Sequence, residues 1–129
     1  MVYKFKDAEK RKVGNEIEII DLYQEKNMPL NFVIGVLNGF HGTMVNEKSI
    51  KYYYIIDGKA KVTINDEITD VEKGDFVVIP VNAKHSIEGN AEFAIICTPP
   101  FDPNYERKYR QIKTRVILTL VFKCLAKKL

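Results

Sequence analysis

Two side chains at alternate positions of one β-rich run, Lys51 and Tyr53, are the first candidates for chemistry in this sequence. The run "KYYYIIDG" is rich in tyrosine and isoleucine, which favour β-strands, and successive side chains of a strand point to opposite faces. We therefore expect Lys51, Tyr53 and Ile55 to share one face. A partly desolvated lysine can hold an anionic group or form a Schiff base, and a phenol can return a proton.

Of the two histidines of the sequence, His41 and His85, His85 is the candidate general base. An imidazole gains or loses a proton near neutral pH, so it can take a proton from a bound molecule and give it back. His85 follows the segment "IPVNAK", and we expect it to act as the base. His41 lies between glycines in "GFHGT", a setting more typical of a turn residue than of a ligand.

Both leading candidates also have an interpretation without chemistry. His85 can be a packed, hydrogen-bonded interior residue. A shift of one residue in strand pairing would turn Lys51 outward, where it would be a solvated surface lysine. The residue types alone leave these alternatives open.

The elements that must position these residues are short β-rich segments separated by turn residues. Asp57-Gly58 lies between two such segments and predicts a hairpin, and a second turn is expected at Asn65-Asp66. Further strands are indicated by "NFVIGVLNG", "GDFVVIP" and "AEFAIICTPP". Apolar residues alternate with polar ones on the run after Gly58, namely Ala60, Val62 and Ile64. This pattern predicts an all-β protein, an antiparallel barrel or sandwich.

The segment "GDFVVIPVNAKH" resembles the second sequence motif of the cupin superfamily. It has the motif's spacing of Gly74, Pro80 and His85, with Asn82 where glycine is usual. The resemblance extends over roughly residues 30 to 103 and includes "TPPFDP". It implies a double-stranded β-helix (jelly-roll) barrel around a central cavity, and it implies a homodimer.

The first cupin motif normally supplies two histidines and a glutamate as metal ligands, and these are replaced here. Counting back from Gly58 places Met44 and Asn46 at the histidine positions and Lys51 at the glutamate position. A thioether and a neutral amide are weak donors, and an ammonium group repels a cation. We therefore expect no metal and no other cofactor.

The resemblance also implies which side chains surround the cavity. Met44, Asn46 and Ile55 are expected to bind the ligand, next to His85, Lys51 and Tyr53 as catalytic residues. A non-standard metal site of His41, Glu47 and His85 is the alternative, and it would require a bulge in the strand that carries His41 and Glu47.

The leading functional hypothesis is a metal-independent isomerase or epimerase acting on a sugar or sugar acid. It rests on analogy with metal-free cupins that move protons on sugars. In this hypothesis His85 is the base, while Lys51 and Tyr53 bind the substrate or act as acids. The ligand would be a small polar or anionic metabolite. A non-catalytic ligand-binding or regulatory cupin is the second hypothesis, and a metal-dependent cupin is the third.

Charge divides the 129 residues into two predicted parts, a cupin barrel over 1–104 and a C-terminal extension over 105–129. The extension contains eight Lys or Arg and one acid, Glu106, whereas the barrel contains 12 bases and 16 acids. Basic residues can meet phosphates of nucleic acid or anionic lipids. We nevertheless expect no nucleic-acid partner, because the extension is better explained as an apolar packing element with a charged rim.

The extension is expected to be a helix that starts at Asp102-Pro103, a favourable cap followed by proline. Polar residues then recur at every fourth position, and the rest of the surface is apolar; the polar stripe comprises Arg115, Thr119, Lys123 and Lys127. A strand at "VILTLVF" is the competing interpretation. The apolar stretch is too short to cross a bilayer, which takes about 20 residues.

The remaining features indicate a cytoplasmic protein. The N-terminal "MVYKFKDAEKRKVGNE" is charged throughout and lacks the apolar core of a signal peptide. Cys97 and Cys124 are far apart and form no CxxC pair, so we expect both to be reduced.

Overall fold

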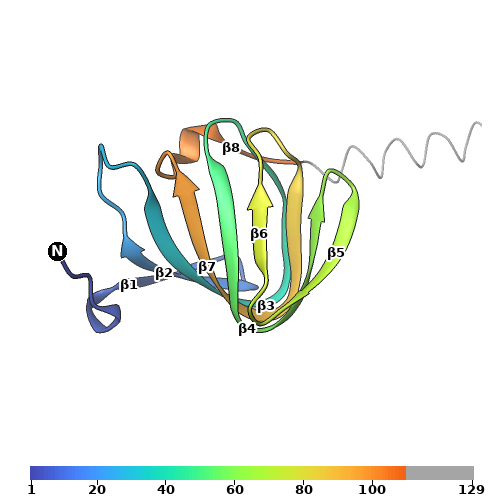
Figure 1. The fold of residues 1–129 in the computed structure, drawn as a ribbon, viewed down its shortest axis with the longest axis horizontal. Coiled ribbons are helices and arrows are strands. Elements are labelled where there is room, and N and C mark those ends of the chain that lie inside the picture. Colours follow the sequence, from blue (N-terminus) through green and yellow to red (C-terminus); the bar gives the residue numbers. More distant parts are fainter. Residues whose placement is uncertain (110–129) are drawn as a thin grey trace, which may run out of the picture.

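The structure, a computed structural model, describes residues 1–109, and these fold as an antiparallel β-sheet protein (Figure 1). The strands are β1 (Glu9–Val13), β2 (Ile17–Tyr23), β3 (Asn31–Asn46), β4 (Ile50–Ile64), β5 (Glu67–Glu72), β6 (Phe76–Ile79), β7 (His85–Thr98) and β8 (Glu106–Lys108). Two single 3-10 turns, η1 (Phe5–Asp7) and η2 (Pro103–Tyr105), complete the elements of this part of the chain. The expected all-β class is confirmed. The apolar helix expected beyond residue 109 lies outside the described residues.

The strands form one sheet in the order β1-β2-β3-β7-β4-β5, with β6 paired to β4 and β8 paired to β3. Figure 1 shows the long strands β3, β4 and β7 curving at the bottom of the view, so that their two halves lie on opposite sides of the molecule. The core fills the space between them, with buried side chains from β2 to β7; its fully buried members include Ile55, Val62, Ile79, Ile87 and Phe93. The long curved strands therefore create an interior in which a cavity can form.

Asp57-Gly58, expected to form a hairpin, lies instead inside the continuous strand β4, so that prediction is wrong. The pairing of β4 with β7 shifts between Ile55 and Asp57, which marks a β-bulge. Gly58 has φ +86°, and a Cβ there would come within 2.8 Å of the Ala91 Cα on β7. The positive φ that makes this dipeptide a good hairpin turn also suits a bulge that bends the strand.

The turn at Asn65-Asp66 is confirmed as the hairpin between β4 and β5. Both residues have positive φ, +47° and +72°, as a two-residue type I′ turn requires, and Ile64 pairs with Glu67 across it. Asn82, which stands where the second motif usually has glycine, also has a positive φ of +67°. Asparagine tolerates this backbone region better than most residues, so the substitution is accommodated.

The inner face of β4 carries the side chains predicted to share it. Lys51, Tyr53 and Ile55 are all buried, whereas Tyr54 on the opposite face is about half exposed. Ala60 and Val62 further along the strand are also buried. The expected alternation is confirmed, and Lys51 is an interior residue.

The chain after the barrel begins as the sequence suggests but does not form a long helix there. The Asp102 side chain accepts a hydrogen bond from the Asn104 amide at 2.9 Å, and the helical turn ends at Tyr105. Residues 106–108 then form β8, which pairs with β3. These residues of the predicted extension therefore belong to the sheet, and the boundary between residues 104 and 105 stays a prediction. Across residues 1–109, no helix has the length and apolar character needed to traverse a membrane.

Candidate functional site

A cavity of about 330 Å³ lies inside the curved sheet. Its wall is mainly apolar, with contributions from β1, β2, β3, β4 and β7 and from the segment leading into β8. A few polar side chains interrupt this wall, including His41, Lys51, Tyr53, His85 and Glu106. The cavity thus has the usual form of a small-molecule site, in which a few polar groups orient a ligand against apolar surface.

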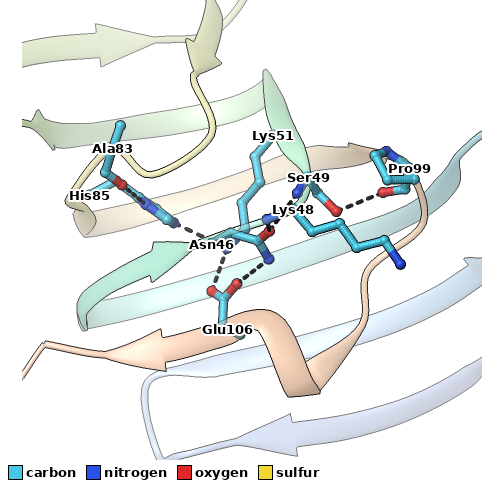
Figure 2. A network of polar contacts seen from close by, with 8 residues as sticks. All are labelled: Asn46, Lys48, Ser49, Lys51, Ala83, His85, Pro99 and Glu106. Atoms are coloured by element: carbon cyan, nitrogen blue, oxygen red, sulfur yellow. Dashed lines mark hydrogen bonds and ion pairs between the residues drawn. The ribbon is translucent and has the colours of Figure 1, made fainter.

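The Lys51 ammonium group and the Glu106 carboxylate form a buried ion pair in the wall of this cavity (Figure 2). Lys51 Nζ lies 2.5 Å from Glu106 Oε1, and both side chains are about nine-tenths buried. The Asn46 amide donates a second hydrogen bond, of 2.6 Å, to Glu106 Oε2. Both oxygens of the carboxylate are therefore held by strands β3 and β4, which fixes β8 against the barrel.

His85, the expected base, has both ring nitrogens engaged within the protein. Nδ1 lies 2.9 Å from the Ala83 carbonyl oxygen, which can only accept, so Nδ1 carries the proton. Nε2 lies 3.1 Å from Lys51 Nζ and accepts a hydrogen bond from the ammonium group. Burial, together with the positive charge of Lys51, lowers the pKa of His85 to about 4. At neutral pH this imidazole is uncharged, and its lone pair is already bonded.

Tyr53 and Cys97 are buried groups that keep their protons. Tyr53 packs against Phe93, with ring centroids 4.9 Å apart, and burial raises the pKa of its phenol well above the usual value. Burial likewise raises the pKa of the Cys97 thiol to about 11. Tyr53 is therefore suited to donate a hydrogen bond, and Cys97 behaves as a small apolar residue, as expected.

His41 lies on the same cavity but on strand β3, next to a β-bulge. The pairing of β3 with β7 shifts between His41 and Met44, and both residues line the cavity. His41 Nδ1 is 2.9 Å from Glu16 Oε1, and the two side chains are partly buried. The hydrogen bond from His41 lowers the pKa of Glu16, so the carboxylate is ionised and accepts a hydrogen bond from the Nδ1–H group.

The structure brings together some of the predicted site residues and not others. His85, Lys51, Tyr53 and Met44 line the cavity. Asn46 does not line it, because its side chain holds Glu106 and accepts hydrogen bonds from the backbone amides of Lys48 and Ser49. Ile55 is completely buried in the core and is likewise absent from the cavity wall. The expected ligand contacts of Asn46 and Ile55 are therefore not supported.

The alternative metal site of His41, Glu47 and His85 is not assembled. Glu47 forms an ion pair with Arg107 away from the cavity, although the bulge that this site required is present. Within residues 1–109, no three His, Cys, Asp or Glu side chains gather in a way that would hold a metal ion.

The positions of the first cupin motif do not fit a metal either. The Lys51 ammonium occupies the place of a carboxylate ligand and is bonded to the one imidazole among these positions. The Asn46 amide is committed to Glu106 and to the turn that follows β3. We therefore derive no chemistry through a metal at these positions.

Two carboxylates of the site, Glu16 and Glu106, were missed from the sequence. Glu16 lies in the turn before β2, and Glu106 comes from a segment assigned to the extension. One signal was available for Glu106, which is the single acid within residues 105–129. A lone acid in a basic segment can mark a residue with a specific partner.

Comparisons with known proteins agree with this fold. The cupin domain family matches residues 39–99. The uncharacterized protein MJ1618 of Methanocaldococcus jannaschii is 39% identical over 57 residues, a match that covers 41% of this chain and 46% of that protein. The match thus spans less than half the length of this curated relative.

Two solved structures are similar over most of the described chain. Pac13 of Streptomyces, described as a unique nucleoside dehydratase, has a TM-score of 0.79 at 21% identity, over 85% of this chain and 91% of that one. Oxalate decarboxylase of Bacillus subtilis has a TM-score of 0.72 at 25% identity, over 82% of this chain and 31% of that one. The fold, the match over residues 39–99 and the second motif ending at His85 together support a cupin superfamily domain in this chain.

Proposed function

We propose that this chain binds a small polar metabolite in the cavity and moves protons on it, as an isomerase, epimerase or dehydratase that uses no metal at the first-motif positions. One observation carries the proposal: both histidines of the protein line a single cavity of about 330 Å³, together with Lys51 and Tyr53. A general base and a protonated phenol beside an apolar wall are the groups that proton transfer needs.

The ligand class is proposed to be a sugar or a sugar-bearing compound. Pac13 has been solved with uridine as variants that carry a Tyr-to-Phe or a His-to-Gln replacement. That structure is similar to this chain in fold alone, so it suggests compounds to test and assigns none. The buried Lys51–Glu106 pair is neutral overall, so the interior favours an uncharged polar group more than the expected anionic one.

Solvent-isotope exchange tests this function. The protein in D₂O would be incubated with uridine, UDP-glucose and glucose 6-phosphate, and each compound would be recovered and analysed by mass spectrometry and NMR. We expect deuterium to enter a carbon-bound position of one of them, or elimination of water from it. Absence of exchange and elimination with all three, at protein concentrations that saturate binding, would contradict the proposal.

Binding without turnover is the second candidate. Lys51 is hydrogen-bonded to both His85 and Glu106, and most of the cavity wall is apolar. Such a site can hold a ligand without reacting with it. Native mass spectrometry would then detect one of the three compounds bound to the protein, with no deuterium in its carbon-bound positions after long incubation.

We also propose that the protein forms a homodimer through the outer face of β4 and β6. Tyr54, Phe76 and Val78 are exposed on this face, and Phe76 stacks on Tyr52 with centroids 5.8 Å apart. Exposed apolar patches of this kind often form protein interfaces. Replacing Phe76 by Ser should convert a dimer to a monomer in light-scattering measurements. An unchanged mass would exclude this face.

A further inference from the structure

The two histidines of the cavity differ in whether a ring nitrogen is left to bind a ligand. On His85, Nε2 accepts from Lys51 and Nδ1 donates to Ala83, so neither nitrogen is available to a ligand. On His41, Nδ1 donates to Glu16, and no atom of residues 1–109 forms a hydrogen bond with Nε2. Because the proton of the neutral ring lies on Nδ1, the Nε2 of His41 carries an unshared lone pair.

The carboxylate that orients His41 is held in a prepared place. Gly14 has φ +74°, and a Cβ there would clash with the Glu16 carboxylate. A Cβ on Gly39 would approach Glu16 Cβ to 3.2 Å. The Glu16 backbone carbonyl is fixed by the Asn38 amide at 2.8 Å. Two glycines and a backbone hydrogen bond thus leave room for Glu16 to reach His41.

Glu16, from the turn before β2, contacts His41 Nδ1 at 2.9 Å. Lys108 of β8 also lines the cavity and helps to lower the pKa of Glu16. Arg11 of β1 lines the cavity as well, but its guanidinium is bound to Asp21 at 2.8 Å. Glu16 is therefore the carboxylate in direct contact with His41.

We propose that His41 is the catalytic acid and base of the cavity and that Glu16 is its positioning residue, an inference that rests on the function proposed above. His41 Nε2 takes a proton from a carbon next to a carbonyl group of the bound compound. The electron pair of that C–H bond forms a C=C double bond, and the π pair of the carbonyl group moves to its oxygen, which gives an enolate. The imidazolium returns the proton to the other face of the same carbon. Where that carbon bears a hydroxyl group, the proton can instead go to the former carbonyl carbon while the hydroxyl proton moves to the enolate oxygen. Tyr53 donates a hydrogen bond to the enolate oxygen and keeps its own proton. His85 holds Lys51 in place.

The tautomer of His41 can be measured directly, because the protein has two histidines and their NMR signals are easily told apart. In ¹⁵N-labelled protein at neutral pH, long-range ¹H–¹⁵N NMR should show His41 protonated on Nδ1 with Nε2 free. In Glu16→Gln this preference should be lost, whereas the His85 signals should stay unchanged. A purely structural role of Glu16 would leave the His41 tautomer as it is, and that result would overturn the positioning role.

Exchange of deuterium assigns the base. Glucose 6-phosphate is the decisive compound, because its open-chain form has a C–H bond next to an aldehyde; uridine and UDP-glucose are tested beside it. We expect His41→Gln to lower the exchange rate by about 100-fold or more. The exchange rate of His85→Gln should fall by a smaller factor. Equal thermal midpoints would show that both variants are folded. Full exchange in His41→Gln with loss in His85→Gln overturns this inference and leaves the proposed function intact. No exchange in the unaltered protein overturns both.

Discussion

Lys51 and Glu106 form a buried ion pair at 2.5 Å, although they are 55 positions apart in the chain. The cation that replaces the glutamate of the first cupin motif is thus neutralised by a carboxylate from β8. A buried charge needs such a partner, because removal from water costs several kcal/mol that an unpaired ion does not recover. The lysine at this motif position and the presence of β8 are therefore connected through one ion pair.

Removing either partner of this pair should destabilise the protein strongly. In Glu106→Gln the Lys51 ammonium stays buried without its counter-charge, and we expect the free energy of unfolding to fall by about 3–5 kcal/mol. Urea denaturation followed by circular dichroism measures it. The double variant Lys51→Met with Glu106→Gln should recover part of the loss, because no buried charge remains.

The neighbouring ion pair of Arg107 and Glu47 provides the control. Arg107 is about two-thirds exposed, and exposed pairs contribute about 0–1 kcal/mol. Arg107→Ala should therefore shift the free energy of unfolding by less than about 1 kcal/mol. If Arg107→Ala and Glu106→Gln lowered the free energy of unfolding by similar amounts, any change in β8 would be equally destabilising. The buried ion pair would then not be the cause of the loss.

The lowered pKa of His85 makes stability depend on pH in a defined window. In the folded protein the pKa is about 4, while the unfolded value is about 6.5. Between these values the unfolded chain binds more protons, so stability rises with pH over this range and is lost progressively as pH falls from about 6.5 to about 4.

Comparison of the protein with His85→Gln isolates this contribution. Both proteins would be unfolded with urea at pH 7 and at pH 5. The carboxylates titrate alike in the two proteins, so the difference between their losses of stability reports on His85. The unaltered protein should lose more stability between these pH values than His85→Gln does. Equal losses would mean that His85 can be charged in the folded state, which contradicts its contact with Lys51.

Cys97 should be chemically silent in the folded protein. Its thiol is buried, and the pKa of about 11 leaves almost no thiolate at pH 8. Cys124 lies outside the described residues, so the full chain carrying Cys124→Ser is the suitable protein. We expect no reaction with Ellman's reagent under native conditions and one thiol after denaturation in urea. Fast native labelling would show that the wall of the cavity opens.

Local sequence patterns predicted the part of the site that lies on β4 and in the second cupin motif. Alternation along β4 predicted that Lys51 and Tyr53 share one face, and the resemblance to the cupin motifs placed that face and His85 at one cavity, where all three residues are found. Glu16 and Glu106 could not be found in this way, because each reaches its partner from a distant segment. Their roles depend on strand pairing and on the bend of the sheet.

The hairpin signal at Asp57-Gly58 failed for a related reason. The dipeptide reports a residue that can adopt a positive φ, and both a hairpin turn and a bulge satisfy it. Which one forms depends on whether a neighbouring strand continues past the site. Here β7 pairs with β4 on both sides of Gly58, so the strand bends and continues. Such a distinction requires knowledge of the partner strand.

The bend itself gives a final prediction. In Gly58→Ala the new methyl group would meet the Asn90 carbonyl and Ala91 on β7, in addition to the strain of φ +86°. Backbone atoms cannot move aside without breaking the β4–β7 pairing. We therefore expect a loss of more than about 3 kcal/mol, which exceeds the roughly 1–3 kcal/mol of backbone strain alone.

Gly74 offers a matched control for that strain. Its φ is +93°, and a Cβ there meets nothing within 4 Å, so Gly74→Ala isolates the backbone term. The free energies of unfolding of the two variants, measured in urea at the same pH, should differ by the cost of the steric clash on β7. If both variants lost the same stability, close packing of β4 on β7 would not be what requires glycine at Gly58. The bend would then depend on backbone conformation alone, and residues that tolerate positive φ, such as asparagine, should replace Gly58 at little cost.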